Sequence, residues 1–295
     1  MMDIEKIKTT RAIGFAVAAA ALYALSSPFS KLLLSEVSPM MLAAFLYLGA
    51  GIGIGLVSLI LKLLGKAETE QPLTKKELPY TIAMVLLDIA APILLMFALT
   101  MTTAANAALL NNFEIAATAV IALIVFKERI SKRLWIAIGF VTAASIMLSF
   151  EDISSLEFSG GSLLVIGACV CWGLENNCTR MLSGKNPLEI VIIKGLFSGT
   201  GALMLALITG ERLPALAQGF MVLLLGFAAY GLSIMLYIYA QRQLGAAKTS
   251  AYYAAAPFIG TILALIIFKQ LPTHGFIAAL AVMAAGAYFA STDNR

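Results

Sequence analysis

Two similar stretches, IALIVFK at residues 121–127 and LALIIFK at residues 263–269, decide the fold of this chain. They share five of seven residues and lie 142 positions apart. A second match near the start of each half, with one gap allowed, aligns Tyr23, Lys31 and Pro39 with Trp172, Arg180 and Pro187. Self-similarity at a fixed offset indicates a repeat architecture. The sequence therefore predicts two copies of one unit, residues 1–150 and 155–295.

The composition is that of a membrane protein. Of the 295 residues, 61% are hydrophobic and 12% are charged. Soluble domains carry about 25% charged residues, so this chain cannot cover its surface with charge. Apolar runs of roughly 20 residues recur, which is the length that a spanning helix needs. The net charge of +4 comes from short, scattered basic clusters, which does not indicate nucleic-acid binding.

The apolar runs predict an all-α integral membrane protein with ten transmembrane helices, five in each copy. The loops between them are short, and the longest is KAETEQPLTKKE at residues 66–77. The predicted spans are residues 12–34, 39–64, 79–101, 103–126, 133–150, 160–183, 187–209, 215–240, 246–268 and 274–291. Within the second, Gly51 and Gly55 are spaced as a small-xxx-small helix contact.

Lysine and arginine placement predicts the orientation, because cytoplasmic loops are enriched in both. With a cytoplasmic N-terminus, sixteen of these residues lie inside, three lie outside, and Lys194 is left within a span. Both termini are then cytoplasmic. Since each copy has an odd number of spans, the second copy enters the membrane from the opposite side. The loops agree, because KERISKR at 127–133 is basic and its counterpart KQLPTHG at 269–275 is nearly uncharged. This predicts an inverted repeat with its substrate site near the midplane.

Ionisable residues inside spans are candidates for function. Glu175 shares a helical face with Trp172, and both are candidate substrate-binding residues, as is Asn176 of the polar run Glu175-Asn176-Asn177. A carboxylate beside an aromatic ring suits an ammonium group. The alternative is that Glu175 lies at the inner helix end, where water and Arg180 satisfy it.

Glu114 is predicted near the middle of its span, with Asn111 on the same face. The counterpart of Glu114 in the second copy is Ala256, which argues against a purely structural role. A carboxyl in an apolar phase can also carry a coupling proton.

Asp88 and Lys194 each allow two interpretations. Pro92 cannot donate to the carbonyl of residue 88, so Asp88 lies at a predicted kink that either forms a polar pocket or merely satisfies the broken backbone. Lys194 could form an ion pair with Glu175 or Glu114, or bind a substrate carboxylate.

Tyr230 and Tyr237 share one helical face and are either core residues or part of a substrate cage. The three cysteines and the single histidine have no metal-ligand spacing, so no metal or cofactor is expected.

The paired five-span halves, the aromatic-x7-cation-x6/7-Pro pattern and Phe126-Lys127-Glu128 closing the fourth span resemble the EamA-like branch of the drug/metabolite transporter superfamily. The resemblance covers nearly the whole chain. It departs at Gln270, which replaces Glu128 in the second copy, and in the second span, which lacks the cation that Lys194 supplies in the seventh. The resemblance implies this fold and a transport function, and leaves the substrate open.

We expect a secondary transporter that works by alternating access and exports an amine-bearing metabolite, such as an amino acid or an organic cation. This expectation rests on the excess of three acids over one lysine deep within the predicted spans, which favours a positively charged substrate. The alternative is an uptake carrier or exchanger for choline or another quaternary amine, and an uncoupled channel or intramembrane enzyme is disfavoured. The expected partners are a small molecule, the lipid bilayer and a coupling proton. We expect a monomer or homodimer in the bacterial inner (plasma) membrane.

Overall fold

The computed structural model describes residues 2–65, 70–125, 127, 131–152, 157–182, 184–244, 249 and 252–292. The first half contains α1 (Met2–Tyr23), α2 (Ser26–Leu33), α3 (Pro39–Leu63), α4 (Leu78–Met101), α5 (Ala104–Leu110), α6 (Phe113–Ile124) and α7 (Lys132–Ser149). The second half contains α8 (Gly160–Leu182), α9 (Pro187–Ile208), α10 (Leu216–Gly226), the π-helix η1 (Phe227–Leu232), α11 (Ser233–Leu244), α13 (Ala256–Phe268) and α14 (His274–Ser291). Short antiparallel strands β1 (Phe150–Asp152) and β2 (Glu157–Phe158) pair at the junction.

These elements form the ten predicted spans, some as one helix and some as consecutive pieces. Within the described residues, seven spans are long and apolar enough to cross a membrane, and α13 and α14 are shorter apolar helices. The remaining span, α8, carries the polar run at 175–177, which lowers its mean hydropathy. Large apolar side chains such as Leu63, Ile124 and Ile208 are exposed on the outside of the bundle, where lipid would cover them. The chain is an all-helical, multi-pass membrane protein.

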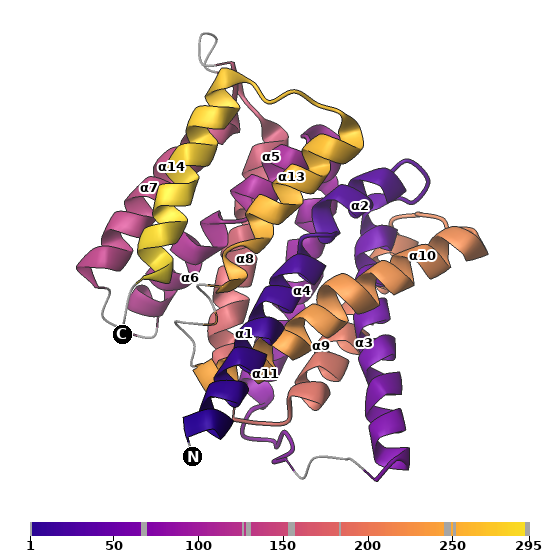
Figure 1. Ribbon diagram of the computed structural model, residues 1–295. Helices are drawn as coiled ribbons and strands as arrows, with labels where there is room; N and C mark the ends of the chain where they lie inside the picture. Colours follow the sequence, from indigo (N-terminus) through magenta and orange to yellow (C-terminus); the bar gives the residue numbers. More distant parts are fainter. Residues whose placement is uncertain are drawn as a thin grey trace.

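The two halves run in opposite directions. Met101 at the end of α4 lies against Gly160 and Gly161 at the start of α8, so α8 begins at the end of the bundle where α4 finishes. In Figure 1, α1 (indigo) runs upward from the N-terminus, and α14 (yellow) runs downward to finish at the same end of the bundle. This is the inverted repeat that the sequence predicts. Which end faces the cytoplasm stays a prediction.

The main helix contacts obey a twofold relation between the halves. The corresponding helices α3 and α9 pack together, as do α7 and α14, and the corresponding fourth and ninth spans meet through α5 and α13. Replacing each helix by its counterpart in the other half turns the α4–α8 contact into the α1–α11 contact, and both contacts are present. Substrate sites in inverted-repeat transporters lie close to such an axis.

The fourth and ninth spans are interrupted at corresponding places, which differs from the continuous helices predicted for them. α5 ends before Asn111-Asn112, and α13 follows a turn at residues 254–255. Each repeated stretch then closes on a left-handed lysine, with φ of 55° at Lys127 and 50° at Lys269. The repeated stretches 121–127 and 263–269 therefore also share the backbone conformation of their last residue. Phe126 and Glu128, and the predicted start of the ninth span, lie outside the described residues.

The crossing of α3 and α9 depends on glycine. A Cβ at Gly51 would lie 2.5 Å from the backbone nitrogen of Leu196, and one at Gly195 would lie 2.3 Å from that of Gly51. The predicted contact at Gly51 is therefore present. The contact predicted at Gly55 is wrong, because a Cβ there meets nothing within 4 Å.

Gly51→Ala and Gly55→Ala form a matched pair on one helix. We expect Gly51→Ala to lower the free energy of unfolding by about 1–3 kcal/mol, because the backbones must separate. Gly55→Ala should be neutral or stabilise the protein by up to about 1 kcal/mol, since alanine favours helix. Thermal unfolding in detergent measures both, and equal effects of the two substitutions would contradict the crossing geometry.

Candidate functional site

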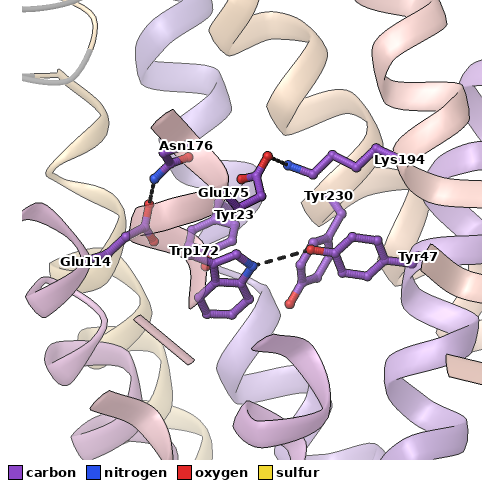
Figure 2. A pocket seen from close by; sticks show the side chains of 8 residues that line it. All are labelled: Tyr23, Tyr47, Glu114, Trp172, Glu175, Asn176, Lys194 and Tyr230. Atoms are coloured by element: carbon purple, nitrogen blue, oxygen red, sulfur yellow. Dashed lines mark hydrogen bonds and ion pairs between the residues drawn. The ribbon is translucent and has the colours of Figure 1, made fainter. Parts of the chain in front are cut away.

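A cavity of about 70 Å³ lies between the two halves of the chain. It is lined by Tyr23, Tyr47, Glu114, Trp172, Glu175, Asn176, Lys194 and Tyr230 (Figure 2). These side chains come from α1, α3, α6, α8, α9 and η1, so both repeats contribute to its wall. The mixture of aromatic rings with a few polar groups is typical of small-molecule sites.

The short connection between α8 and α9 places two opposite charges at the same depth. Glu175 lies seven residues before the end of α8, and Lys194 lies seven residues after the start of α9. At 1.5 Å per residue, both are about 10 Å inside their helix ends. The side chain of Glu175 is 2% exposed, so the interpretation of a wetted helix end does not hold.

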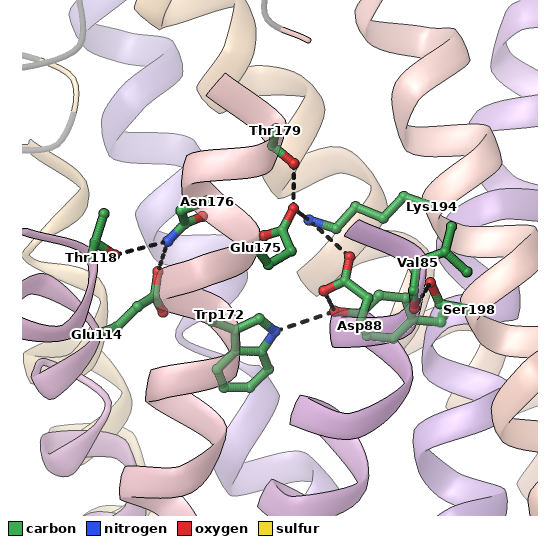
Figure 3. Close-up of polar contacts among 11 residues, drawn as sticks. Val85, Asp88, Glu114, Thr118, Trp172, Glu175, Asn176, Thr179, Lys194 and Ser198 are labelled. Atoms are coloured by element: carbon green, nitrogen blue, oxygen red, sulfur yellow. Dashed lines mark hydrogen bonds and ion pairs between the residues drawn. The ribbon is translucent and has the colours of Figure 1, made fainter. Parts of the chain in front are cut away.

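Lys194 is held between two carboxylates. Its Nζ lies 2.9 Å from Glu175 Oε1 on α8 and 3.2 Å from Asp88 Oδ2 on α4 (Figure 3). The Thr179 hydroxyl also donates to Glu175 Oε1. Because the side chains of Asp88 and Lys194 are 0% and 8% exposed, the pairing replaces water for all three charges. It also joins a helix of the first repeat to two of the second.

Asp88 is reached from the cavity through Tyr47. The Tyr47 hydroxyl donates to Asp88 Oδ1 at 2.8 Å, and Trp172 Nε1 donates to the Tyr47 oxygen at 3.4 Å. Tyr47 and Trp172 line the cavity, whereas Asp88 lies behind them. The hydrogen bonds form a chain from the cavity wall to the buried carboxylate.

Glu114 lies in the first turn of α6, directly after the break in the fourth span. Asn176 Nδ2 donates to Glu114 Oε1 at 2.6 Å and lies 3.4 Å from Thr118 Oγ1 (Figure 3). No ion pair among the described residues includes Glu114. Its partner is a neutral amide, so its charge is not compensated.

Aromatic rings cover the other side of the cavity. The ring of Tyr230 lies 5.9 Å from that of Tyr23 and 5.3 Å from that of Tyr47. Tyr230 belongs to the π-helical segment, a conformation frequent at functional sites, and its hydroxyl shares a 2.8 Å hydrogen bond with Ser26. Figure 2 shows Trp172 between Glu114 on one side and Tyr47 and Tyr230 on the other.

The charges around the cavity do not cancel. Asp88, Glu114 and Glu175 carry three formal negative charges, and Lys194 carries one positive charge. Since net charge in an apolar phase is costly, a cation or protons must compensate the excess. The described residues contain no group of three side chains placed to hold a metal ion.

A sequence model of the EamA-like transporter family matches residues 10–150 and 159–292. The chain belongs to this family. An uncharacterized transporter of Methanothermobacter thermautotrophicus strain Delta H is 25% identical over 271 residues, 86% of this chain and 78% of that protein. The uncharacterized transporter YyaM of Bacillus subtilis strain 168 is 23% identical over 195 residues, 62% of this chain and 63% of that protein.

A solved crystal structure shares the fold, with a TM-score of 0.67 at 18% identity over 95% of this chain and 96% of that one. Membership of the EamA-like transporter family makes the protein a membrane transporter of the drug/metabolite transporter superfamily with a small-molecule substrate, and not an enzyme.

The structure brings together six of the nine side chains that the sequence selected as substrate-binding. The six that line the cavity are Glu114, Trp172, Glu175, Asn176, Lys194 and Tyr230. Asp88 lies behind them. Asn111 and Tyr237 are not among the lining residues: Asn111 Oδ1 faces Cys169 Sγ at 3.9 Å, and the Tyr237 ring packs on Tyr253 at 4.9 Å.

Sequence reasoning did not select Tyr23 and Tyr47 as site residues. Tyr23 was assigned to the fold pattern alone. Tyr47 lies eight residues into α3 and is 2% exposed. A tyrosine well inside an apolar span needs a hydrogen-bond partner for its hydroxyl. This requirement could have identified Tyr47 as a neighbour of a buried polar group.

Removing Lys194 tests whether the central ion pairs stabilise the fold. We expect Lys194→Met to lower the free energy of unfolding by about 3–5 kcal/mol, because two buried carboxylates lose their counter-ion. The control is Lys185→Met, which removes a pair with Glu77 at 3.5 Å where both side chains are 18% exposed. That loss should be below about 1 kcal/mol.

Adding Asp88→Asn and Glu175→Gln to Lys194→Met should restore part of the stability. Thermal unfolding in detergent measures all of these variants. A loss no larger for Lys194→Met than for Lys185→Met would show that the buried pairs are not stabilising.

Proposed function

We propose that this protein is a secondary transporter that exports a small amine-bearing metabolite, an amino acid or an organic cation, by alternating access. One observation carries the proposal: at the cavity between the two repeats, a single lysine pairs with two carboxylates, and a third carboxylate, Glu114, lines the wall with no ion-pair partner among the described residues. An ammonium group compensates this excess of negative charge, and an anionic substrate would increase it. The chain contains no nucleotide-binding motif that would support a primary pump.

The substrate's ammonium is placed between Glu114 and Trp172. Glu114 has an amide as its partner and no counter-ion among the described residues, so it can pair with a cation without first losing one. The Trp172 ring supplies a face to which a cation is attracted, and this attraction strengthens when water is excluded. Asn176, bonded to Glu114, orients the carboxylate toward the cavity.

The aromatic lining also supports a second candidate, a carrier or exchanger of choline or another quaternary amine. Tyr23, Tyr47, Trp172 and Tyr230 supply four rings to one small cavity. Aromatic cages bind methylated ammonium groups because these cannot donate hydrogen bonds and are easily desolvated.

Alternating access is supported by the symmetry of the bundle. The repeats are inverted, and the fourth and ninth spans are interrupted at corresponding places, the first of them directly before the cavity-lining Glu114. Interrupted helices at corresponding positions are the usual pointer to a transporter's binding site. Exchange of the two repeat conformations would open the cavity to one end and then to the other. The cavity is built within one chain, which supports the monomer as the transporting unit in either a monomer or a homodimer.

We place the protein in the bacterial inner membrane with both termini in the cytoplasm. The excess of lysine and arginine at the end of the bundle where α1 begins supports this orientation. Transport against a gradient is proposed to use a coupling proton.

Glu114→Gln tests the ammonium site. In a thermal-shift screen of lysine, putrescine, ethanolamine and choline, we expect at least one amine to raise the unfolding temperature, because a ligand of the folded state stabilises it. Glu114→Gln should abolish that shift, with at least a tenfold loss of affinity, about 1.4 kcal/mol.

Glu36→Gln, the same substitution at an exposed position, should retain the shift seen with the unmodified protein. A shift that survives Glu114→Gln contradicts this placement of the ammonium. A larger shift with choline than with ethanolamine, lost in Trp172→Leu, would favour the quaternary-amine alternative.

Orientation is tested by labelling single cysteines in intact cells. In a background with Cys169, Cys171 and Cys178 replaced by alanine, Ser35→Cys lies at one end of the bundle and Lys76→Cys at the other. A membrane-impermeant maleimide should label Ser35→Cys in intact cells, and Lys76→Cys only after permeabilisation. The reverse pattern would place the termini outside.

A further inference from the structure

Asp88 is the one carboxylate of the charged cluster that does not line the cavity. It is 0% exposed on α4, and two lining residues, Tyr47 and Lys194, stand between it and the cavity. A substrate in the cavity therefore meets Glu114 and Glu175 directly, and influences Asp88 only through these two side chains.

The two oxygens of Asp88 have different partners. Oδ1 accepts the 2.8 Å hydrogen bond from Tyr47, whereas Oδ2 accepts no hydrogen bond within the described part of the chain and faces the Lys194 ammonium at 3.2 Å. Lys194 also serves Glu175, so one ammonium is shared by two carboxylates. The shared ammonium leaves one formal negative charge of this triad uncompensated.

We propose that Asp88 holds the coupling proton, and that a proton on Asp88 and an ammonium group in the cavity oppose each other through Lys194. The opposition between the proton and the ammonium group rests on the proposed function. Asp88 is thus a proton site separate from the ammonium site at Glu114, the residue to which the sequence alone first assigned the proton.

The proton reaches Asp88 through Tyr47. The Tyr47 hydroxyl passes its proton to Asp88 Oδ1 and takes another from a hydronium ion that enters the cavity from bulk solvent and leaves as water, so the net change is one proton moved from the solvent to Asp88. Lys194 then loses one of its two carboxylates and pairs with Glu175 alone. The formal charge around the cavity falls from −2 to −1, which weakens attraction for a second cation.

The reverse sequence follows when an ammonium enters. It pairs with the cavity carboxylates, Lys194 turns to Asp88, and the ionised form of Asp88 is favoured. Because coupling between two ligands is reciprocal, a substrate that expels the proton is itself expelled by it. This mutual exclusion is what an exporter driven by proton entry requires.

The charges around Asp88 can be named for each helix that packs on α4. α3 contributes Tyr47, α8 contributes Glu175 and α9 contributes Lys194. On α2, Lys31 instead binds the carbonyls of Leu99 and Thr102 at the far end of α4. α5 carries no titratable side chain. Lys194 and Glu175 thus set the charge state of Asp88, with Tyr47 as the hydrogen-bond donor.

The proton site can be tested without any substrate. The chain has two tryptophans, and Trp135→Phe removes the exposed one, leaving Trp172 one hydrogen bond from Tyr47 and two from Asp88. We expect the emission of Trp172 in the purified full-length protein to change with pH in one step. Asp88→Asn should abolish that step, and Glu114→Gln should retain it.

A step that survives Asp88→Asn, or that is lost only in Glu114→Gln, overturns the assignment, as does emission that does not vary with pH. If Asp88→Asn does not fold, the pH titration of Trp172 emission is repeated with Tyr47→Phe. Tyr47→Phe keeps every charge and removes one hydrogen bond to Asp88, so the midpoint of the step should move. Tyr80→Phe, on the helix that carries Asp88, should leave the midpoint in place.

An unmoved midpoint in Tyr47→Phe also overturns the proton site. Because no amine is present in these titrations, the site at Asp88 can fail while amine binding at Glu114 holds, and the reverse. Their opposition is then measured with the amine that gives the largest thermal shift: its affinity should fall at least tenfold below the pH of the step, and Asp88→Asn should remove this dependence. An affinity that does not change across the step overturns the opposition alone.

Discussion

The ammonium of Lys194 between Asp88 and Glu175 is the interaction on which the site depends. Three charges lie about 10 Å or more from the helix ends, where water cannot satisfy them, so each position is acceptable only while the others are occupied. This mutual requirement fixes the relative depth of α4, α8 and α9 and joins the two repeats at their centre. It also leaves one formal negative charge without a counter-ion, and this excess is the basis for proposing a cationic substrate.

The close crossing of α3 and α9 makes that cluster possible. Gly195 follows Lys194 directly, and a Cβ there would lie 2.8 Å from the Tyr47 carbonyl oxygen and 2.3 Å from the Gly51 nitrogen. The absence of side chains at Gly51 and Gly195 lets the backbones touch. Tyr47 can then reach Asp88 from one side while Lys194 reaches it from another. The same backbone packing therefore sets the geometry of the site, and widening this crossing would separate Tyr47 and Lys194 from Asp88.

Much of the fold follows from the sequence, because apolar runs, loop charges and the repeated IALIVFK and LALIIFK depend on local composition. The buried acids and Lys194 could also be recognised as candidate site residues, since an ionisable residue in an apolar span is costly. Their partners were not. The Lys194–Asp88 pair joins residues 106 positions apart and depends on how α4 and α9 meet, which no periodicity encodes. The interruption before α13 was missed because it falls on alanines, and the one at Asn111-Asn112 because two polar residues are compatible with one polar face of a continuous helix.

The scaffold is symmetric and the charges are not, and this contrast is what a transporter of one substrate needs. Glu114 aligns with Ala256, Glu175 aligns with Ser26, and the second span has no counterpart of Lys194. If both repeats carried the same charges, two equivalent sites would flank the axis and a substrate would gain nothing by occupying the centre. In the proposed alternating-access cycle, symmetric packing would give the inward and outward conformations similar energies. Charges confined to one set of positions would then give a single binding site that both conformations share, with Ser26 bonding Tyr230 rather than adding a charge.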